Sequence, residues 1–270
     1  MKNAKQLKDL IKNMGREKGI NPQVLHRIYM MERLLERISL SEYKSNFILK
    51  GGMLVAALIG VDMRATVDMD ATMKSYAVTK ESIEDVFKKV FSIQLDDGVT
   101  FEIKKVYEIR EEDDYRGFSV SLDALMENVK IPIKVDITTG DKITPKEITY
   151  EYKLMFEERN IGVLAYNVET VLAEKFEAVL SRGVTNTRMR DFYDLHVLLK
   201  TQRENIDIEV LKEAVLATAI KRKSVEKLKE GRLILEEIFL DALMSGHWSR
   251  YQKKFSYAKG VTWLEILKMD

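Results

Sequence analysis

The sequence contains no cysteine and only three prolines among its 270 residues. The lack of cysteine excludes a disulfide framework, a cysteine zinc site and thiol chemistry. It also fits a reducing compartment, so we expect a cytoplasmic protein. No apolar signal core follows the lysine-rich start, and the longest apolar run, residues 53–61, is far too short to cross a bilayer. We therefore expect no membrane attachment.

Several common functional motifs are also missing. The three histidines have no metal-ligand spacing, and neither an H-E-x-x-H string nor a Walker A loop is present. Charged residues make up 32% of the chain, and the formal net charge is only +1. The basic surplus lies in residues 1–40 and 211–270, whereas the middle is acidic. Basic ends could flank a polyanion, although solvated helix faces would give the same pattern.

The hydrophobic periodicity predicts an α+β fold. The boundary falls near residue 167, which separates an α+β domain at 1–167 from a helical domain at 168–270. A turn is predicted over Glu111–Arg116. The expected helices are 4–18, 22–39, 53–59, 79–91, 168–182, 188–200, 208–221, 224–244, 246–256 and 262–268. The expected strands are 46–49, 66–73, 100–110, 117–125, 131–138, 147–153 and 161–166.

Two aspartates, Asp68 and Asp70, stand in an apolar setting shortly after a Gly51-Gly52 step. On a strand they would share a face, about 7 Å apart along the chain. Two like charges so placed are costly unless a cation bridges them, and hard oxygen ligands suit Mg²⁺ or Mn²⁺. Glycine backbone just before a helix could bind phosphate. A solvated edge strand and a simple tight turn are the alternatives.

A third carboxylate, Asp136, lies in an alternating segment, Ile131–Ile137, that is typical of a half-buried strand. Its apolar residues fall on one face, and Asp136 falls on the other with Lys134. Asp136 could therefore stand beside the aspartate pair on a neighbouring strand. Such a group of carboxylates indicates metal-dependent phosphoryl or nucleotidyl transfer.

The order of glycine pair, D-x-D and apolar-Asp-apolar resembles the polymerase-beta-like nucleotidyltransferases. The string R-x-T-x-D-x-D at 64–70, together with residues 169–178 and 190–195, is similar to the AbiEii/AbiGii toxin family of abortive-infection and type IV toxin–antitoxin systems. The matched blocks span about residues 46–200. Met53-Leu54 replaces the Thr-Ala that commonly follows the glycines, which we expect to affect packing.

The resemblance implies a nucleotidyltransferase-like mixed sheet with flanking helices, followed by a helical domain that contributes to the site. It assigns Asp68, Asp70 and Asp136 to Mg²⁺ or Mn²⁺. The resemblance implies nucleotide contacts for Gly51, Gly52 and Lys175, and site roles for Lys175 and Asp191. Arg64 and Thr66 could contact a phosphate or a site carboxylate of the nucleotide site; alternatively, Thr66 is a β-favouring residue on a strand and Arg64 is a surface residue at the strand start. From the residues alone, Lys175 could instead reach solvent beside a core stripe, and Asp191 could favour a helix dipole. We expect Asp194 to hold a neighbouring base, Arg190 or Lys175.

The resemblance further implies an NTP donor, an RNA acceptor such as a tRNA 3′ end, growth arrest in phage defence, and a separately encoded antitoxin. A protein-modifying nucleotidyltransferase and a catalytically silent nucleotide- or RNA-binding protein remain alternatives. An aromatic group in residues 248–263 lies beside Lys253, Lys254 and Lys259. It could stack on bases or could pack helices together. Neither the NTP nor the oligomeric state follows from the sequence.

Overall fold

The computed structural model describes residues 3–109 and 117–267 and divides into two compact units. The first, here called the sheet unit, comprises Met1–Asp141 and Ile148–Ala165. The second, the helical unit, comprises Lys142–Glu147 and Tyr166–Asp270. The short segment 142–147 thus packs with the helical unit although strands lie on both sides of it in the sequence. The predicted turn at Glu111–Arg116 lies outside the described residues.

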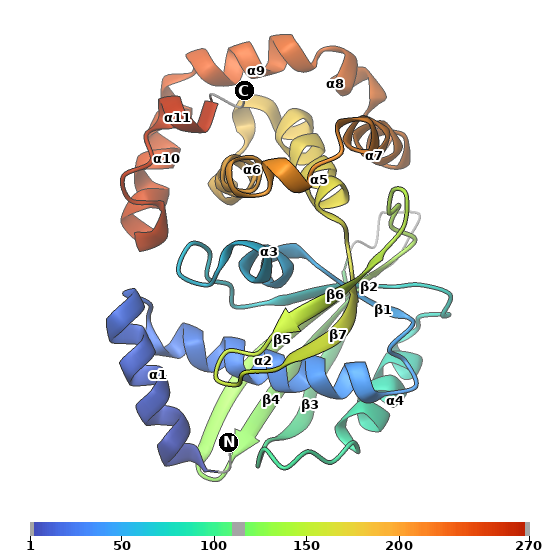
Figure 1. Cartoon of the computed structure of the whole chain (residues 1–270). Helices are drawn as coiled ribbons and strands as arrows, with labels where there is room; N and C mark the ends of the chain where they lie inside the picture. Colours follow the sequence, from blue (N-terminus) through green and yellow to red (C-terminus); the bar gives the residue numbers. More distant parts are fainter. Residues whose placement is uncertain (1–2, 110–116, 268–270) are drawn as a thin grey trace. The chain divides into compact units, whose positions relative to one another are not determined.

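The sheet unit is built on a mixed seven-stranded sheet of order β3-β4-β5-β2-β1-β7-β6 (Figure 1). The pairs β2–β5 and β1–β7 are parallel, and the other neighbours are antiparallel. This confirms the predicted α+β class with a mixed sheet. The strands are β1 (Phe47–Lys50), β2 (Met69–Met73), β3 (Thr100–Ile109), β4 (Gly117–Met126), β5 (Val129–Thr139), β6 (Ile148–Lys153) and β7 (Asn160–Ala165).

Among the helices that the structure describes in the sheet unit, three begin at a side-chain cap. Thr79 and Ser82 form a capping box, and Asn3 and Asn21 accept backbone N–H groups at the starts of the first two helices. α2 contacts β5 and β7, whereas α3 contacts β1 and β2. The helices are α1 (Ala4–Lys18), α2 (Pro22–Leu40), α3 (Gly51–Ile59) and α4 (Lys80–Phe91).

The core of the sheet unit lies on one face of strands β4 and β5. Phe118, Val120, Val135 and Ile137 are almost fully buried, while the residues between them in the sequence carry the polar side chains. Alternation along each strand therefore leaves the second face for polar groups. That polar face carries the candidate site.

The helical unit consists of α5 (Val168–Arg182), α6 (Met189–Thr201), α7 (Ile208–Lys221), α8 (Val225–Lys229), α9 (Gly231–Leu240), α10 (Ala242–Lys254) and α11 (Trp263–Leu267). Short 3₁₀ turns occupy Gly183–Thr185, Arg203–Asn205 and Ser256–Ala258. The prediction of one helix over 224–244 was wrong. The chain breaks at Glu230 and at Asp241, where the Asp241 side chain accepts the N–H groups of Leu243 and Met244 and starts a new helix.

A second correction concerns the strand expected over 66–73. It begins only at Met69, so Thr66 and Asp68 precede β2 rather than lie on it. Across the part of the chain that the structure describes, no helix combines the length and apolarity that a membrane crossing requires.

Candidate active site

A row of polar residues runs across four neighbouring strands of the sheet. Lys50 on β1 is the register partner of Asp70 on β2, which in turn pairs with Asp136 on β5. Ser119 on β4 is the next register partner, and its hydroxyl donates to Asp136 Oδ1 at 2.6 Å. Register partners point to the same face, so the sheet brings Asp70 and Asp136 together about 4.8 Å apart by strand spacing.

The two glycines make room for the row. Gly51 has φ +63°, and a Cβ there would lie 2.1 Å from Asp70 Oδ2. At Gly52 a Cβ would lie 2.7 Å from Thr66 Oγ1 and 3.1 Å from an Arg64 terminal nitrogen. The Gly52 N–H instead donates to Asp70 Oδ2 at 3.4 Å. Both glycines form the first turn of α3, and the Gly52 N–H, one of the groups there without a helical partner, faces the carboxylate.

The electrostatic environment of Asp70 is unfavourable for its charge. Burial raises the pKa of Asp70 above its ordinary value, and the Asp136 and Asp68 carboxylates add to this increase. The Lys50 ammonium and the Gly52 N–H act in the opposite direction but do not cancel it. A cation at the row would therefore stabilise the ionised form.

Asp136 is held at both oxygens. Its Oδ1 accepts from Ser119, and its Oδ2 lies 2.7 Å from the Lys134 ammonium. The pKa of Lys134 is raised, first by this bond and then by the surrounding negative charge of Asp136 and Asp68, against the effect of burial. These contacts fix the orientation of Asp136 on the polar face.

Lys50 and Asp141 form a buried ion pair that the sequence analysis missed. Lys50 Nζ lies 2.5 Å from Asp141 Oδ2, and the Thr138 hydroxyl donates to the same oxygen. Burial alone would raise the pKa of Asp141, but Lys50, Thr138 and Thr72 outweigh it and lower this pKa to about 2. The position of Lys50 next to the glycines was the available signal.

The residues before β2 have a packing role. Arg64 is 1% exposed, so the interpretation as a surface residue at a strand start was wrong. It donates to the Ala65 carbonyl and lies close to Gly52. The hydroxyl of Thr66, which is also buried, donates to the backbone carbonyl of Asp68 at 3.2 Å. These contacts hold the loop that presents Asp68.

The carboxylates of the row form only part of a ligand set for a divalent cation. Within residues 3–109 and 117–267, no group of three or more His, Cys, Asp or Glu side chains is gathered closely enough to hold a metal. Asp70 and Asp136 do lie side by side, with Asp68 near enough to shift the pKa of Asp70. A Mg²⁺ ion commonly takes one or two protein carboxylates and completes its shell with water and phosphate oxygens. The residues fit such a partial set.

A second polar cluster lies within the helical unit. Lys175 Nζ on α5 lies 2.6 Å from Asp194 Oδ2 and 3.3 Å from Asp191 Oδ1, both on α6. The expectation that Asp194 holds a neighbouring base is therefore confirmed. Asp194 is fully buried, and the second oxygen of Asp191 lies 3.4 Å from the Arg188 guanidinium. Lys175 thus neutralises buried carboxylates and does not extend freely into solvent.

The C-terminal aromatic residues pack against α6. Trp248 is 1% exposed and donates from Nε1 to the Val261 carbonyl, and the rings of Tyr193 and Tyr257 have centroids 5.0 Å apart. Tyr251 and Tyr257 share a hydroxyl hydrogen bond. Helix packing therefore explains the cluster. The neighbouring Lys253, Lys254 and Lys259 are exposed.

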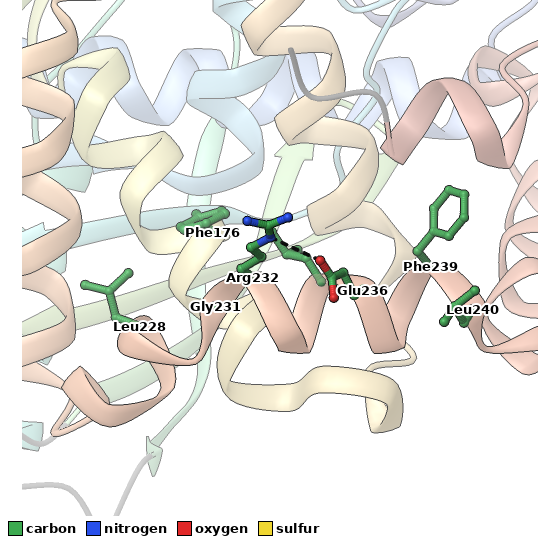
Figure 2. A pocket seen from close by; sticks show the side chains of 8 residues that line it. Phe176, Leu228, Gly231, Arg232, Glu236, Phe239 and Leu240 are labelled. Atoms are coloured by element: carbon green, nitrogen blue, oxygen red, sulfur yellow. Dashed lines mark hydrogen bonds and ion pairs between the residues drawn. The ribbon is translucent and has the colours of Figure 1, made fainter.

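The helical unit also carries a groove of about 640 Å³, shown in Figure 2. Apolar side chains dominate its lining, among them Phe176, Leu228, Leu235 and Phe239. Arg232 and Glu236 form an ion pair of 3.1 Å in it. None of its lining residues is a carboxylate of the row or a member of the Lys175 cluster, so this groove is not the candidate active site.

Comparison with known structures supports the fold. JHP933 from Helicobacter pylori has a TM-score of 0.52 at 17% identity, over 92% of this chain and 90% of that one. A second H. pylori structure, named as that of a nucleotidyltransferase, has a TM-score of 0.53 at 17% identity, over 93% of this chain and 94% of that one. At such identity the likeness concerns the fold alone. No curated protein matches the sequence.

The fold is similar to that of a structure named as a nucleotidyltransferase. The family model for the nucleotidyl transferase AbiEii toxin of type IV toxin–antitoxin systems matches residues 33–267. The chain belongs to this family, and the resemblance noted in the sequence is confirmed. Membership makes the protein a nucleotidyltransferase toxin, with a nucleotide as substrate and an antitoxin as partner.

Proposed function

We propose that the protein transfers a nucleoside monophosphate from an NTP to an RNA acceptor, most simply a tRNA 3′ end, in a Mg²⁺-dependent reaction. Growth arrest, and with it a role in phage defence, would follow from loss of functional RNA. The observation that carries the proposal is the register of Asp70 with Asp136, beside the first turn of α3, where the Gly52 N–H donates to Asp70 Oδ2. Carboxylates that can hold a metal ion, next to a helix start that can bind an anion, are suited to binding the phosphates of a nucleoside triphosphate.

In this proposal Asp68, Asp70 and Asp136 hold Mg²⁺ or Mn²⁺. Such an ion polarises the phosphoryl oxygens and favours ionisation of the attacking hydroxyl. Gly51 and Gly52 bind phosphate oxygens through their backbone.

Other residues of the proposed site position the nucleophile and the phosphates. Asp136, fixed by Ser119 and Lys134, orients the acceptor hydroxyl or takes its proton as that oxygen attacks the α-phosphate and pyrophosphate leaves. Arg64 and Thr66 support the loop that carries Asp68. Lys175 and Asp191 take the roles that the family pattern assigns them, with Lys175 neutralising the β- and γ-phosphates.

The reaction can be tested by incubating the protein with each α-³²P-NTP, Mg²⁺, and total RNA or total protein. The proposal expects labelled RNA, and Asp70→Ala and Asp136→Ala should abolish the label. Asp62→Ala provides a matched control, because Asp62 is an exposed carboxylate paired with Lys18. Label in protein would establish the protein-modifying alternative. If wild-type protein labels nothing with any NTP, the silent binding alternative replaces the proposal.

The proposal that the acceptor is RNA can be tested through the exposed lysines. A long RNA is held by its phosphates, so its affinity should fall steeply with salt. Replacing Lys253, Lys254 and Lys259 by glutamine should weaken RNA binding and reduce the salt slope by up to about three units. NTP affinity should change little. Glutamine at Lys5, Lys8 and Lys12, which are exposed on α1, tests the other basic end in the same assay.

A further inference from the structure

The polar row continues onto the outermost strand of the sheet. Tyr107 on β3 is the register partner of Ser119, the residue that donates to Asp136. Because register partners share a face, Tyr107 lies on the same face as the carboxylates.

Tyr107 differs from the other aromatic residue of its strand. Phe101 is 7% exposed and belongs to the core, whereas Tyr107 is 37% exposed. The ammonium of Lys105 lies 5.4 Å from the centroid of the Tyr107 ring. Lys105 pairs in register with Ser121 and so faces the same side. An exposed ring with a cation beside it is the combination that stacks nucleobases and tolerates a phosphate nearby.

The spacing also suits a nucleotide. Tyr107 stands two strands from Asp136, which corresponds to about 10 Å across the sheet. In a nucleotide the ribose separates the base from the phosphates. A ligand whose phosphate lies at Asp70 and Asp136 can therefore extend along the row and place its base at β3.

We propose that Tyr107 is a stacking platform for a nucleobase, with Lys105 providing positive charge over one face of the ring. This inference rests on the proposed function, because it assumes that Asp70 and Asp136 bind the phosphates of a nucleotide. The base belongs either to the NTP or to the terminal nucleotide of the acceptor. Nothing in the chemistry of the ring depends on which base is bound, because every base has a π-face.

The test compares two ligands that share phosphates and differ in the base. Affinities for the NTP that serves as donor and for inorganic tripolyphosphate are measured by calorimetry with Mg²⁺, for wild type, Tyr107→Ala and Tyr107→Phe. If the base of the NTP stacks on the ring, Tyr107→Ala should weaken NTP binding at least about fivefold. Tripolyphosphate binding should not change, and Tyr107→Phe should retain wild-type affinity for both.

A second experiment measures the affinity of wild type and Tyr107→Ala for the acceptor RNA. A loss of RNA affinity in Tyr107→Ala, with NTP affinity unchanged, assigns the platform to the acceptor base. Tyr76→Ala is the matched control: it removes another aromatic ring of the sheet unit, one that packs edge-on against Tyr43 beyond the far end of β2. It should affect none of the three ligands.

The outcomes separate this inference from the proposed function. If Tyr107→Ala binds NTP and RNA within twofold of wild type, the platform is wrong, although the carboxylate site stands. Equal weakening of NTP and tripolyphosphate would also contradict it, because the effect would then concern the phosphates. If wild type binds neither phosphate ligand, the proposed function fails first and the inference falls with it.

Discussion

The Lys50 ammonium lies 2.5 Å from the Asp141 carboxylate, although 91 residues separate them in the sequence. Both side chains are largely buried, and Lys50 is also the register partner of Asp70. The pair therefore fixes a positive charge at one end of the carboxylate row. The Lys50 charge reduces the free-energy cost of ionising Asp70. It does so as the partner of Asp141 and not as a ligand for phosphate.

Asp141→Asn should leave the Lys50 charge without its carboxylate and lower the free energy of unfolding by about 3–5 kcal/mol at neutral pH. The pKa of Asp141 is lowered to about 2, so its contribution is present above about pH 4 and is lost as pH falls toward 2. Urea unfolding at several pH values measures both effects. Asp62→Asn breaks an exposed pair and should cost less than about 1 kcal/mol. Equal costs for the two variants would contradict this account.

Gly51→Ala should lower the free energy of unfolding by more than the cost of placing alanine at a positive φ. The new Cβ would lie 2.1 Å from Asp70 Oδ2, so the carboxylate or the start of α3 must move. Gly19 is the control, since it has a similar φ of +66° and a Cβ added there would meet nothing within 4 Å. Gly19→Ala should cost about 1 kcal/mol. Gly51→Ala should cost more and also reduce Mg²⁺-dependent NTP binding; identical thermal shifts in the two variants would refute the close approach.

Lys175→Met should destabilise the protein by about 3–5 kcal/mol, because it leaves the buried Asp191 and Asp194 without their ammonium. Combining it with Asp194→Asn removes one of the stranded charges and should recover part of that stability. If Lys175 also binds phosphates, the double variant should still bind NTP weakly at a temperature where it is folded. Recovery of both stability and NTP affinity would limit Lys175 to a structural role.

Stability between about pH 4.5 and 8 should fall with rising pH because of Glu32. Burial raises the pKa of Glu32 to about 8, against the Met155 N–H, the Arg33 charge and the Tyr152 hydroxyl. The folded state therefore retains a proton that the unfolded chain releases, and the slope reaches up to about 1.4 kcal/mol per pH unit. Glu32→Gln should flatten the profile, whereas Glu81→Gln, at an exposed position, should not. An unchanged profile in Glu32→Gln would show that another group controls it.

Much of the fold could be predicted because alternation and helical periodicity are local. The strand expected over 131–138 is β5, Val129–Thr139, since half-burial imposes a period of two along it. Strand pairing is not local in this sense. Thr66 and Val67 favour extended structure, yet β2 begins only where Met69 meets Val135 on β5. The D-x-D spacing alone could not reveal that Asp68 stands in a loop.

The candidate site could be predicted only in part for the same reason. The sequence singles out Asp70 and Asp136 because each stands among apolar neighbours, and the sheet places them side by side. Nothing local pairs Lys50 with Asp141. For Asp194 the sequence predicted a basic partner but left Arg190 and Lys175 as alternatives, and the fold selects Lys175. Those contacts depend on side chains from distant segments that meet after folding. Tyr107 could likewise not be singled out from the sequence, because its place beside Ser119 depends on the register of β3 with β4.

The chain passes between the two units three times, because residues 142–147 join the helical unit before β6 and β7 return to the sheet. Thr144 is anchored there by the Asn167 and Thr170 side chains. During synthesis, residues 142–147 are made before Asn167 and Thr170, to which Thr144 is hydrogen-bonded. Strand β1 likewise cannot pair with its parallel neighbour β7 until β7 has been made. A nascent chain that ends before β7 (Asn160–Ala165) therefore lacks a finished sheet edge. The carboxylate row, by contrast, has all its strands once β5 has emerged, so the toxin can assemble its acidic centre while its fold is still incomplete.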